Sequence, residues 1–251
     1  MKKIGFLGCG KIGGSLYRHI TENGRGEVCF IQDPFWPAEK EAVCPVTDVA
    51  DEMLYREADL VIECANSSVL RENIRSILKN CDLLMFSVTA FADREFEAQA
   101  KALCEEYGRH IYLPHGAILG LDGIFDGRRG IRDVFIETRK SPASLGISCD
   151  ERTVVFEGTT REACGVFPRN VNVHAAVALA GIGMDRTRSR IIADPAVDTN
   201  EHSIAAEGDG FAFRLEISSL GKGAVTGAYT PMSACGSLDR VLGCADPIIF
   251  V

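Results

Sequence analysis

The chain has 251 residues, enough for one large domain or two modest ones. Hydrophobic residues make up 46% of it and charged residues 25%, as in an ordinary globular protein. Its formal net charge of -8 argues against a nucleic-acid or membrane-surface partner, because both bind basic surfaces. We expect neither a signal peptide nor a membrane span, since the chain opens on strand-like residues and no apolar run is long enough to cross a bilayer.

Ten cysteines are spread along the sequence without a pattern that would suggest pairing. They form no C-x-x-C motif and no Cys/His cluster with the spacing of zinc ligands. The sequence therefore predicts reduced thiols in a cytoplasmic protein, and no metal site.

The first 114 residues alternate short apolar runs with helical stretches. Apolar runs without polar alternation indicate strands that are buried on both faces. We expect strands at 4–7, 27–32, 60–64, 83–88 and 110–113, and helices at 12–22, 69–79 and 93–107. Ser67 or Ser68 could cap the middle helix. This order predicts a Rossmann-type, doubly wound parallel sheet in an α/β fold.

The connection between the first strand and the first helix reads Gly8-Cys9-Gly10-Lys11-Ile12-Gly13. In a dinucleotide-binding turn the first glycine permits the tight turn, the second lets the pyrophosphate approach, and the third lets helix and strand pack closely. The helix N-terminus would then hold the phosphates. We therefore predict that Gly8, Gly10, Lys11, Ile12 and Gly13 bind a dinucleotide; a structural turn without a ligand is the alternative.

Asp33 closes the second strand, 20 residues beyond Gly13. A carboxylate there would accept hydrogen bonds from an adenosine ribose and would repel a 2′-phosphate, which favours NAD. NADP stays possible, because a nearby Lys or Arg could reverse this preference. Cys64 and Ala65 end another strand, where they would meet the cofactor.

After Pro114 the pattern changes to amphipathic strands mixed with helices. Strands are expected at 132–139, 153–157, 188–193, 202–206 and 211–218, and helices at 161–167 and 173–181. Val134, Ile136 and Thr138 fall on one face of the first of these strands. The pattern predicts a second, α+β domain on an open mixed sheet, with one face left for helices or a partner. A last helix at 232–242 would return to the first domain, giving domains 1–114 plus 225–251 and 115–224.

Two of the five histidines are placed for chemistry. His115 lies at the crossing between the domains, and His202 follows a proline-containing loop at the start of a strand. A histidine there could exchange protons near neutral pH, although a strand-end histidine bonded to backbone is also common. His174, near the start of an apolar helix, is more typical of a buried structural histidine, and His19 and His110 of structural or exposed ones.

Several segments together resemble the L-aspartate dehydrogenase family. Besides the glycine turn, they are residues 114–122 (PHGAILGLD), 138–140 (TRK), 155–158 (VFEG), 167–173 (FPRNVNV) and 194–204, which begins Asp-Pro and ends Asn-Glu-His-Ser-Ile. The resemblance runs in order from residue 4 to about residue 218 and is weaker beyond residue 221.

The resemblance implies a homodimeric NAD(P)-dependent enzyme that acts on a small amino acid. It would oxidise L-aspartate to iminosuccinate, which hydrolyses to oxaloacetate and ammonia, or run the reverse reductive amination. His202 matches the family's catalytic histidine, and Ala117 and Asn172 match positions that contact the nicotinamide half of the cofactor. For the two substrate carboxylates the leading candidates are Lys140 and Asn200, followed by Arg169 and Arg139.

Two departures keep alternatives open. The family usually has a small residue at the position of His115, so an imidazole there could contact the substrate and change which substrate the enzyme prefers. A dehydrogenase or imine reductase for a different substrate is therefore the first alternative, and a non-catalytic NAD(H)-sensing protein the second. The loop at 219–230, with Gly221, Gly223 and Gly227, also differs from the family pattern.

Overall fold

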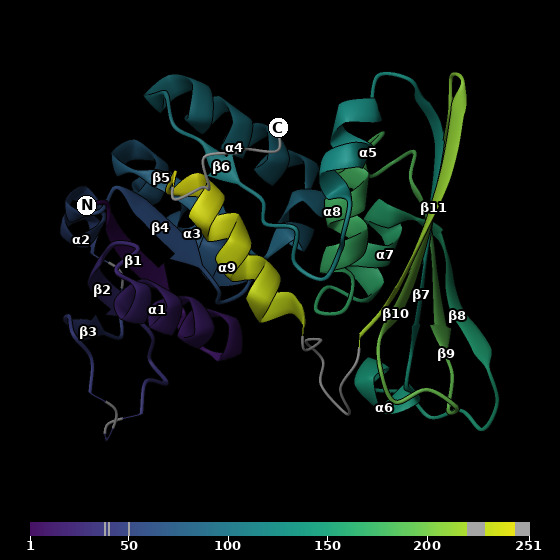
Figure 1. The fold of residues 1–251 in the computed structure, drawn as a ribbon, viewed down its shortest axis with the longest axis horizontal. Helices are drawn as coiled ribbons and strands as arrows, with labels where there is room; N and C mark the ends of the chain where they lie inside the picture. Colours follow the sequence, from purple (N-terminus) through teal and green to yellow (C-terminus); the bar gives the residue numbers. More distant parts are fainter. Residues whose placement is uncertain (38, 40, 50, 220–228, 244–251) are drawn as a thin grey trace. The chain divides into compact units, whose positions relative to one another are not determined.

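The structure is a computed structural model that describes residues 1–37, 39, 41–49, 51–219 and 229–243 (Figure 1). It divides into two compact units: unit 1 comprises Met1–Pro114 and Pro231–Val251, and unit 2 comprises His115–Thr230. The predicted return to the first domain, between residues 224 and 225, lies outside the described residues, as does most of the loop at 219–230.

Unit 1 contains a six-stranded parallel sheet in the order β3-β2-β1-β4-β5-β6. Its strands are β1 (Lys3–Leu7), β2 (Glu27–Gln32), β3 (Val46–Thr47), β4 (Leu60–Glu63), β5 (Asp82–Met85) and β6 (Ile111–Tyr112). The chain adds strands on one side of β1 and then on the other, so the order reverses between β1 and β4. In open parallel sheets, ligands bind at the carboxyl ends of the strands at such a reversal. The predicted Rossmann-type sheet is confirmed.

The helices of unit 1 connect these strands or cover the sheet. They are α1 (Lys11–Asn23), α2 (Glu52–Glu57), α3 (Ser67–Asn80), the 3₁₀ helix η1 (Val88–Ala92), α4 (Arg94–Tyr107) and α9 (Tyr229–Val241). Neither serine expected to cap α3 does so. Instead, the side chain of Asn66 accepts hydrogen bonds from the backbone N–H groups of Ser68 at 2.9 Å and Val69 at 3.1 Å. Asn66 is therefore the N-cap, because an N-cap side chain binds the N–H groups two and three residues further along the chain.

Helix α9 packs on unit 1. Ala234 and Leu238 are fully buried in the same apolar cluster as Ile4 of β1 and Leu16 of α1. At the surface, His19 Nε2 of α1 lies 2.9 Å from a carboxylate oxygen of Asp239. Figure 1 shows α9, in yellow, beside α1.

Unit 2 is built on a five-stranded mixed sheet in the order β11-β10-β7-β9-β8. Its strands are β7 (Ile131–Lys140), β8 (Thr153–Thr159), β9 (Arg188–Ala193), β10 (Glu201–Gly208) and β11 (Phe211–Ser218). Its helices are α5 (Leu121–Gly127), α6 (Pro142–Leu145), α7 (Thr160–Val166) and α8 (Asn172–Ala180). Only β7 and β9 are parallel, and α5, α7 and α8 lie on one face of the sheet (Figure 1). The predicted open mixed sheet is confirmed.

Strand β7 separates two kinds of side chain by its alternation. Val134, Ile136 and Thr138 are buried on the helix-covered face, as predicted, and Lys140 continues that row while being only 4% exposed. Arg139 lies on the opposite face of the strand, because successive side chains of a strand point to opposite sides.

No helix among the described residues has the length and apolarity needed to cross a membrane. The nine cysteines of the described part of the chain are all free thiols.

Candidate functional site

The glycine-rich turn of unit 1 has the backbone geometry of a dinucleotide-binding turn. Gly8 has φ +82°, and a Cβ there would lie 2.9 Å from the backbone of Ala65. A Cβ on Gly13 would lie 2.8 Å from the carbonyl oxygen of Gly8, so a larger residue would push α1 away from β1. At Gly10, by contrast, an added Cβ would meet no described atom within 4 Å. The turn is thus tight on its protein side and open where a pyrophosphate would approach.

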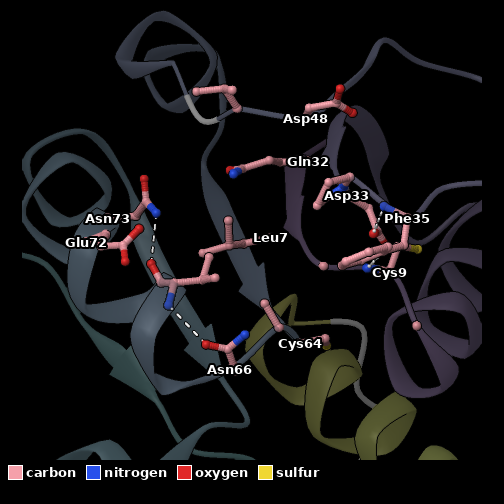
Figure 2. A pocket seen from close by; sticks show the side chains of 16 residues that line it. Leu7, Cys9, Gln32, Asp33, Phe35, Asp48, Cys64, Asn66, Glu72 and Asn73 are labelled. Atoms are coloured by element: carbon pink, nitrogen blue, oxygen red, sulfur yellow. Dashed lines mark hydrogen bonds between the residues drawn. The ribbon is translucent and has the colours of Figure 1, made fainter.

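A cavity of about 610 Å³ opens beside this turn (Figure 2). Of the predicted cofactor residues, it is lined by Gly8, Gly10, Asp33, Cys64 and Ala65. The sequence did not single out Gln32, Asp48, Glu72 or Asn73, which line it too. Lys11, Ile12 and Gly13 are not part of its lining and form the first turn of α1.

Asp33 joins the glycine turn to the end of β2. One carboxylate oxygen accepts a hydrogen bond from the backbone N–H of Cys9 at 2.8 Å, and the other accepts one from that of Phe35 at 2.9 Å. Each oxygen keeps a further lone pair for a ligand. Asp33 therefore holds the turn in place and can still accept from ribose hydroxyls.

The described lining of the cavity carries negative charge only. Asp33, Asp48 and Glu72 contribute three carboxylates, and the lining contains no Lys or Arg among the residues that the structure describes (Figure 2). A ribose 2′-phosphate beside Asp33 would be repelled, whereas uncharged ribose hydroxyl groups would find acceptors there.

Glu63, at the end of β4, fixes the neighbouring turn from inside the protein. Its fully buried carboxylate accepts hydrogen bonds from the N–H of Ala65 at 2.8 Å and of Phe86 at 3.2 Å. Ser87 donates two more, from its N–H at 3.0 Å and its hydroxyl at 2.8 Å. Burial raises the pKa of Glu63, and these four donors oppose that rise. The position of Ala65 on the cavity wall thus depends on Glu63, whose own side chain is buried and does not line the cavity.

Unit 2 carries a second polar cluster, on the helix-covered face of its sheet. His202 of β10 is paired with Thr138 of β7, and its Nδ1 lies 2.8 Å from the Thr138 hydroxyl oxygen. Asn200, just before β10, is buried as well, and Lys140 ends β7 on the same face. The strand pairing thus gathers His202, Asn200 and Lys140 at one end of β7 and β10.

Burial makes both ionisable groups of this cluster unusual. It lowers the pKa of His202 to about 3, with a smaller contribution from the positive charge of Lys140. Burial likewise lowers the pKa of Lys140 to about 8. Lys140 donates to the backbone carbonyl of Asn170 at 3.1 Å and lies 3.4 Å from its side-chain oxygen. Strongly shifted pKa values gather at functional sites, so this cluster is a candidate site.

His174 of α8 belongs to the same cluster through Thr138, whose hydroxyl oxygen lies 2.7 Å from His174 Nε2. Its buried, hydrogen-bonded state agrees with the structural role expected for it. The link to His202 was not expected, although the alternation of β7 had already placed Thr138 on the inner face.

Two arginines considered for substrate carboxylates are placed differently. Arg139 lies on the outer face of β7 and pairs with Glu201 and, at 3.3 Å, with Asp194, so it is committed to the protein's own carboxylates. Arg169 is exposed in the segment before α8.

The remaining predicted site residues lie in unit 2. His115 and Ala117 are half-buried in the segment before α5, and Asn172 is the first residue of α8. Their contacts with a cofactor or a substrate stay predictions.

Each half of the chain matches the model of a known protein family. Residues 8–114 match the model of the homoserine dehydrogenase NAD-binding domain, and residues 124–241 match the C-terminal domain of aspartate dehydrogenase. L-aspartate dehydrogenase from Methanosarcina acetivorans is 36% identical over 96% of this chain and 97% of its own length. The chain belongs to the L-aspartate dehydrogenase family.

Other members of the L-aspartate dehydrogenase family agree with this assignment. The relative from Archaeoglobus fulgidus is 35% identical, covering 82% of each chain. The crystal structure of aspartate dehydrogenase from Thermotoga maritima superposes with a TM-score of 0.81 over the full length of both chains, at 29% identity. A dihydrodipicolinate reductase from Paenisporosarcina sp. TG-14, with 15% identity and a TM-score of 0.55, shares the fold alone.

Membership of the L-aspartate dehydrogenase family confirms the predicted enzyme class, a nicotinamide-dependent amino-acid dehydrogenase. The NAD-binding model covers the glycine turn and Asp33, so a nicotinamide cofactor is confirmed as well.

Proposed function

We propose that this protein catalyses the NAD-dependent oxidative deamination of L-aspartate, through iminosuccinate, to oxaloacetate and ammonia, or the reverse reductive amination. The observation that carries the proposal is the buried group of His202, Lys140 and Asn200 on one face of the unit 2 sheet, in a chain of this family. The group combines a proton acceptor with a cation and an amide, which the amine and the carboxylates of an acidic amino acid require.

The cavity of unit 1 fits the adenosine and pyrophosphate parts of NAD. The open space at Gly10 admits the pyrophosphate, and Asp33 offers acceptors to the ribose. The all-acidic described lining supports NAD over NADP. Ala117 and Asn172 would contact the nicotinamide half, as the family resemblance implies. When bound, the nicotinamide ring supplies the hydride acceptor.

His202 would act on the protons of the reaction. The substrate ammonium must lose a proton before its carbon can release hydride, because the nitrogen lone pair drives that step. His202, which is neutral at pH 7, would accept this proton or activate the water that attacks the imine. Lys140 and Asn200 would hold the carboxylates and orient the reacting carbon. His115 would line the substrate site and limit the size of the substrate that it admits.

A coupled assay tests the proposal. Production of NADH from L-aspartate, and its consumption with oxaloacetate plus ammonia, should depend on His202. His202→Ala should reduce kcat by roughly 10²–10⁴-fold, the range for one acid–base group, with NADH affinity unchanged. Lys140→Met should mainly raise the KM for aspartate.

The same assay separates the alternatives. Turnover of other 2-amino acids or imines, but not of aspartate, would favour the alternative based on His115. NADH binding without turnover of any amino acid or imine would favour a cofactor sensor. Full activity of His202→Ala would remove this histidine from the mechanism.

We also propose a homodimer formed through the sheet face of unit 2 opposite α7 and α8. This face carries cross-strand ion pairs rather than an unbroken charged surface, among them Arg188–Asp133 at 2.7 Å and Arg190–Glu157 at 2.9 Å. Paired charges of this kind can be covered by a symmetric copy without leaving a single charge isolated. Sedimentation at micromolar concentration should give twice the monomer mass of 27.2 kDa, and a monomer would refute the proposal.

A further inference from the structure

A continuous hydrogen-bonded chain leads away from His202 into the interior of unit 2. Its members are buried side chains from five different elements: His202 (β10), Thr138 (β7), His174 (α8), Ser189 (β9) and Thr160 (α7). The four links between them measure 2.8, 2.7, 2.9 and 2.8 Å in that order. The chain ends where the Thr160 hydroxyl donates to the backbone carbonyl of Thr187 at 3.2 Å.

The hydrogen bond at this end sets the direction that we assign to the inner links. The Thr187 carbonyl oxygen can only accept, and we assign the single hydroxyl proton of Thr160 to it. Ser189 must then donate to Thr160, which uses the only proton of its own hydroxyl. His174 Nδ1, which lies 2.9 Å from Ser189, must therefore carry a proton and donate it.

The directions of the outer two links follow from the proton on His174 Nδ1. Burial lowers the pKa of His174 well below its ordinary value, so the ring is neutral and its Nε2 carries no proton. Thr138 therefore donates to His174 Nε2, and its oxygen accepts from His202 Nδ1. A neutral His202 with a proton on Nδ1 has its lone pair on Nε2.

We propose that Thr138, His174, Ser189 and Thr160 are positioning residues that hold His202 as the Nδ1–H tautomer, leaving Nε2 as the atom that takes up the substrate proton. This proposal rests on the acid–base role proposed for His202. The chain is not an exit path for protons, because the carbonyl at its end cannot accept one. It acts by orientation: once Nε2 is protonated, each successive donor polarises the next link and favours the charged ring.

The tautomer can be read directly, without substrate, by NMR of protein labelled with ¹⁵N in its histidine rings. With five histidines in the sequence, His→Gln variants can assign the signals. In the unmodified protein, the proton of the neutral His202 ring should be on Nδ1. Thr138→Val removes the acceptor while keeping the shape, and should move protons to Nε2 and lower kcat roughly 10–100-fold, the effect of one lost hydrogen bond to a charged group. Thr138→Ser should restore both.

If Thr138→Val fails to fold, a matched pair of serine variants still tests the proposal. Ser189→Ala breaks the chain one step further on and should release the His174 tautomer, with a smaller fall in kcat. Ser219→Ala makes the same change at a buried hydroxyl that has no hydrogen-bond partner among the described residues, and should alter neither.

Three results would overturn the proposal: a proton on Nε2 of His202 in the unmodified protein, unchanged spectra and kcat in Thr138→Val, or no recovery in Thr138→Ser. Failure of the proposed function looks different. Full activity in His202→Ala would remove the acid–base role even with the proton on Nδ1, whereas an inactive His202→Ala combined with an Nε2 proton would reject the positioning chain alone.

Discussion

Asp33 offers the sharpest test of cofactor recognition, because one carboxylate has two roles that can be separated. It accepts hydrogen bonds from the N–H groups of Cys9 and Phe35, which hold the glycine turn, and it would also accept from the ribose. Asp33→Ala removes both roles. Asp33→Asn removes the charge but keeps one oxygen that can still accept from Cys9.

The expected magnitudes follow from these contacts. A hydrogen bond to a charged acceptor contributes about 1.5–3 kcal/mol, so losing one ribose bond should weaken NADH binding roughly 10–100-fold. Loss of the turn contacts should weaken both cofactors alike, but only NADPH gains in addition, because its 2′-phosphate no longer meets the Asp33 charge. At about 4 Å and an effective dielectric constant of about 20, that repulsion is on the order of 4 kcal/mol before screening by salt. Asp33→Ala should therefore lower the preference for NADH at least roughly 10-fold.

Dissociation constants for NADH and NADPH, measured by nicotinamide fluorescence without substrate, give the ratio directly. Asp48→Asn is the matched control, because it removes one charge from the same cavity wall but should leave NADH affinity unchanged. Equal weakening of both cofactors in Asp33→Ala would mean that Asp33 only holds the turn. An equal change of the ratio in Asp48→Asn would show that the cavity's overall charge, and not Asp33, discriminates between the cofactors.

Three further variants probe buried groups. Leu238→Ala should lower the free energy of urea unfolding of unit 1 by about 2–5 kcal/mol through the cavity it leaves, and an unchanged midpoint would mean that α9 is not anchored there. Glu63→Gln should weaken NADH binding, measured by titration with NADH. It should also lower the free energy of unfolding by about 1–3 kcal/mol for each donor left unpaired, measured by titration with urea. Unchanged NADH affinity would mean that Glu63 does not fix the cavity wall. Since the pKa of His202 is lowered to about 3 in the fold against about 6.5 when unfolded, stability present at pH 7 should be lost as pH falls through that window, by up to about 1.4 kcal/mol per pH unit. His202→Gln should flatten this dependence in urea unfolding followed by circular dichroism, and an equally steep loss would refute the lowered pKa.

The parts of the fold that the sequence predicts are those with a local physical signal. The glycine turn and Asp33 are recognisable because the chemistry of a dinucleotide site demands those residues at that spacing. The inner face of β7 follows from its period of two. The short helices α2 and α5 have too few turns to show a helical period and are not among the elements predicted from the sequence.

The polar contacts of the candidate site depend instead on docking between distant segments. Thr138 and His174 are 36 residues apart, and they meet only because α8 packs on the face to which Thr138 points. Residue type is equally uninformative here, since a threonine within a strand is ordinary and a histidine on an apolar helix is usually structural. The link between them could be seen only once both elements were placed.

The two units position their site residues by the same physical means. In unit 1, the buried carboxylate of Glu63 gathers donors from two segments and fixes Ala65 on the cavity wall. In unit 2, the hydroxyl of Thr138 lies within hydrogen-bond distance of both the His202 and His174 rings, and so holds His202 in place. A buried polar group left without its partner costs more than the bond contributes, so each arrangement tolerates only one orientation of the residue it holds. Functional precision in this protein should therefore be as sensitive to these supporting groups as to the residues that would contact cofactor and substrate.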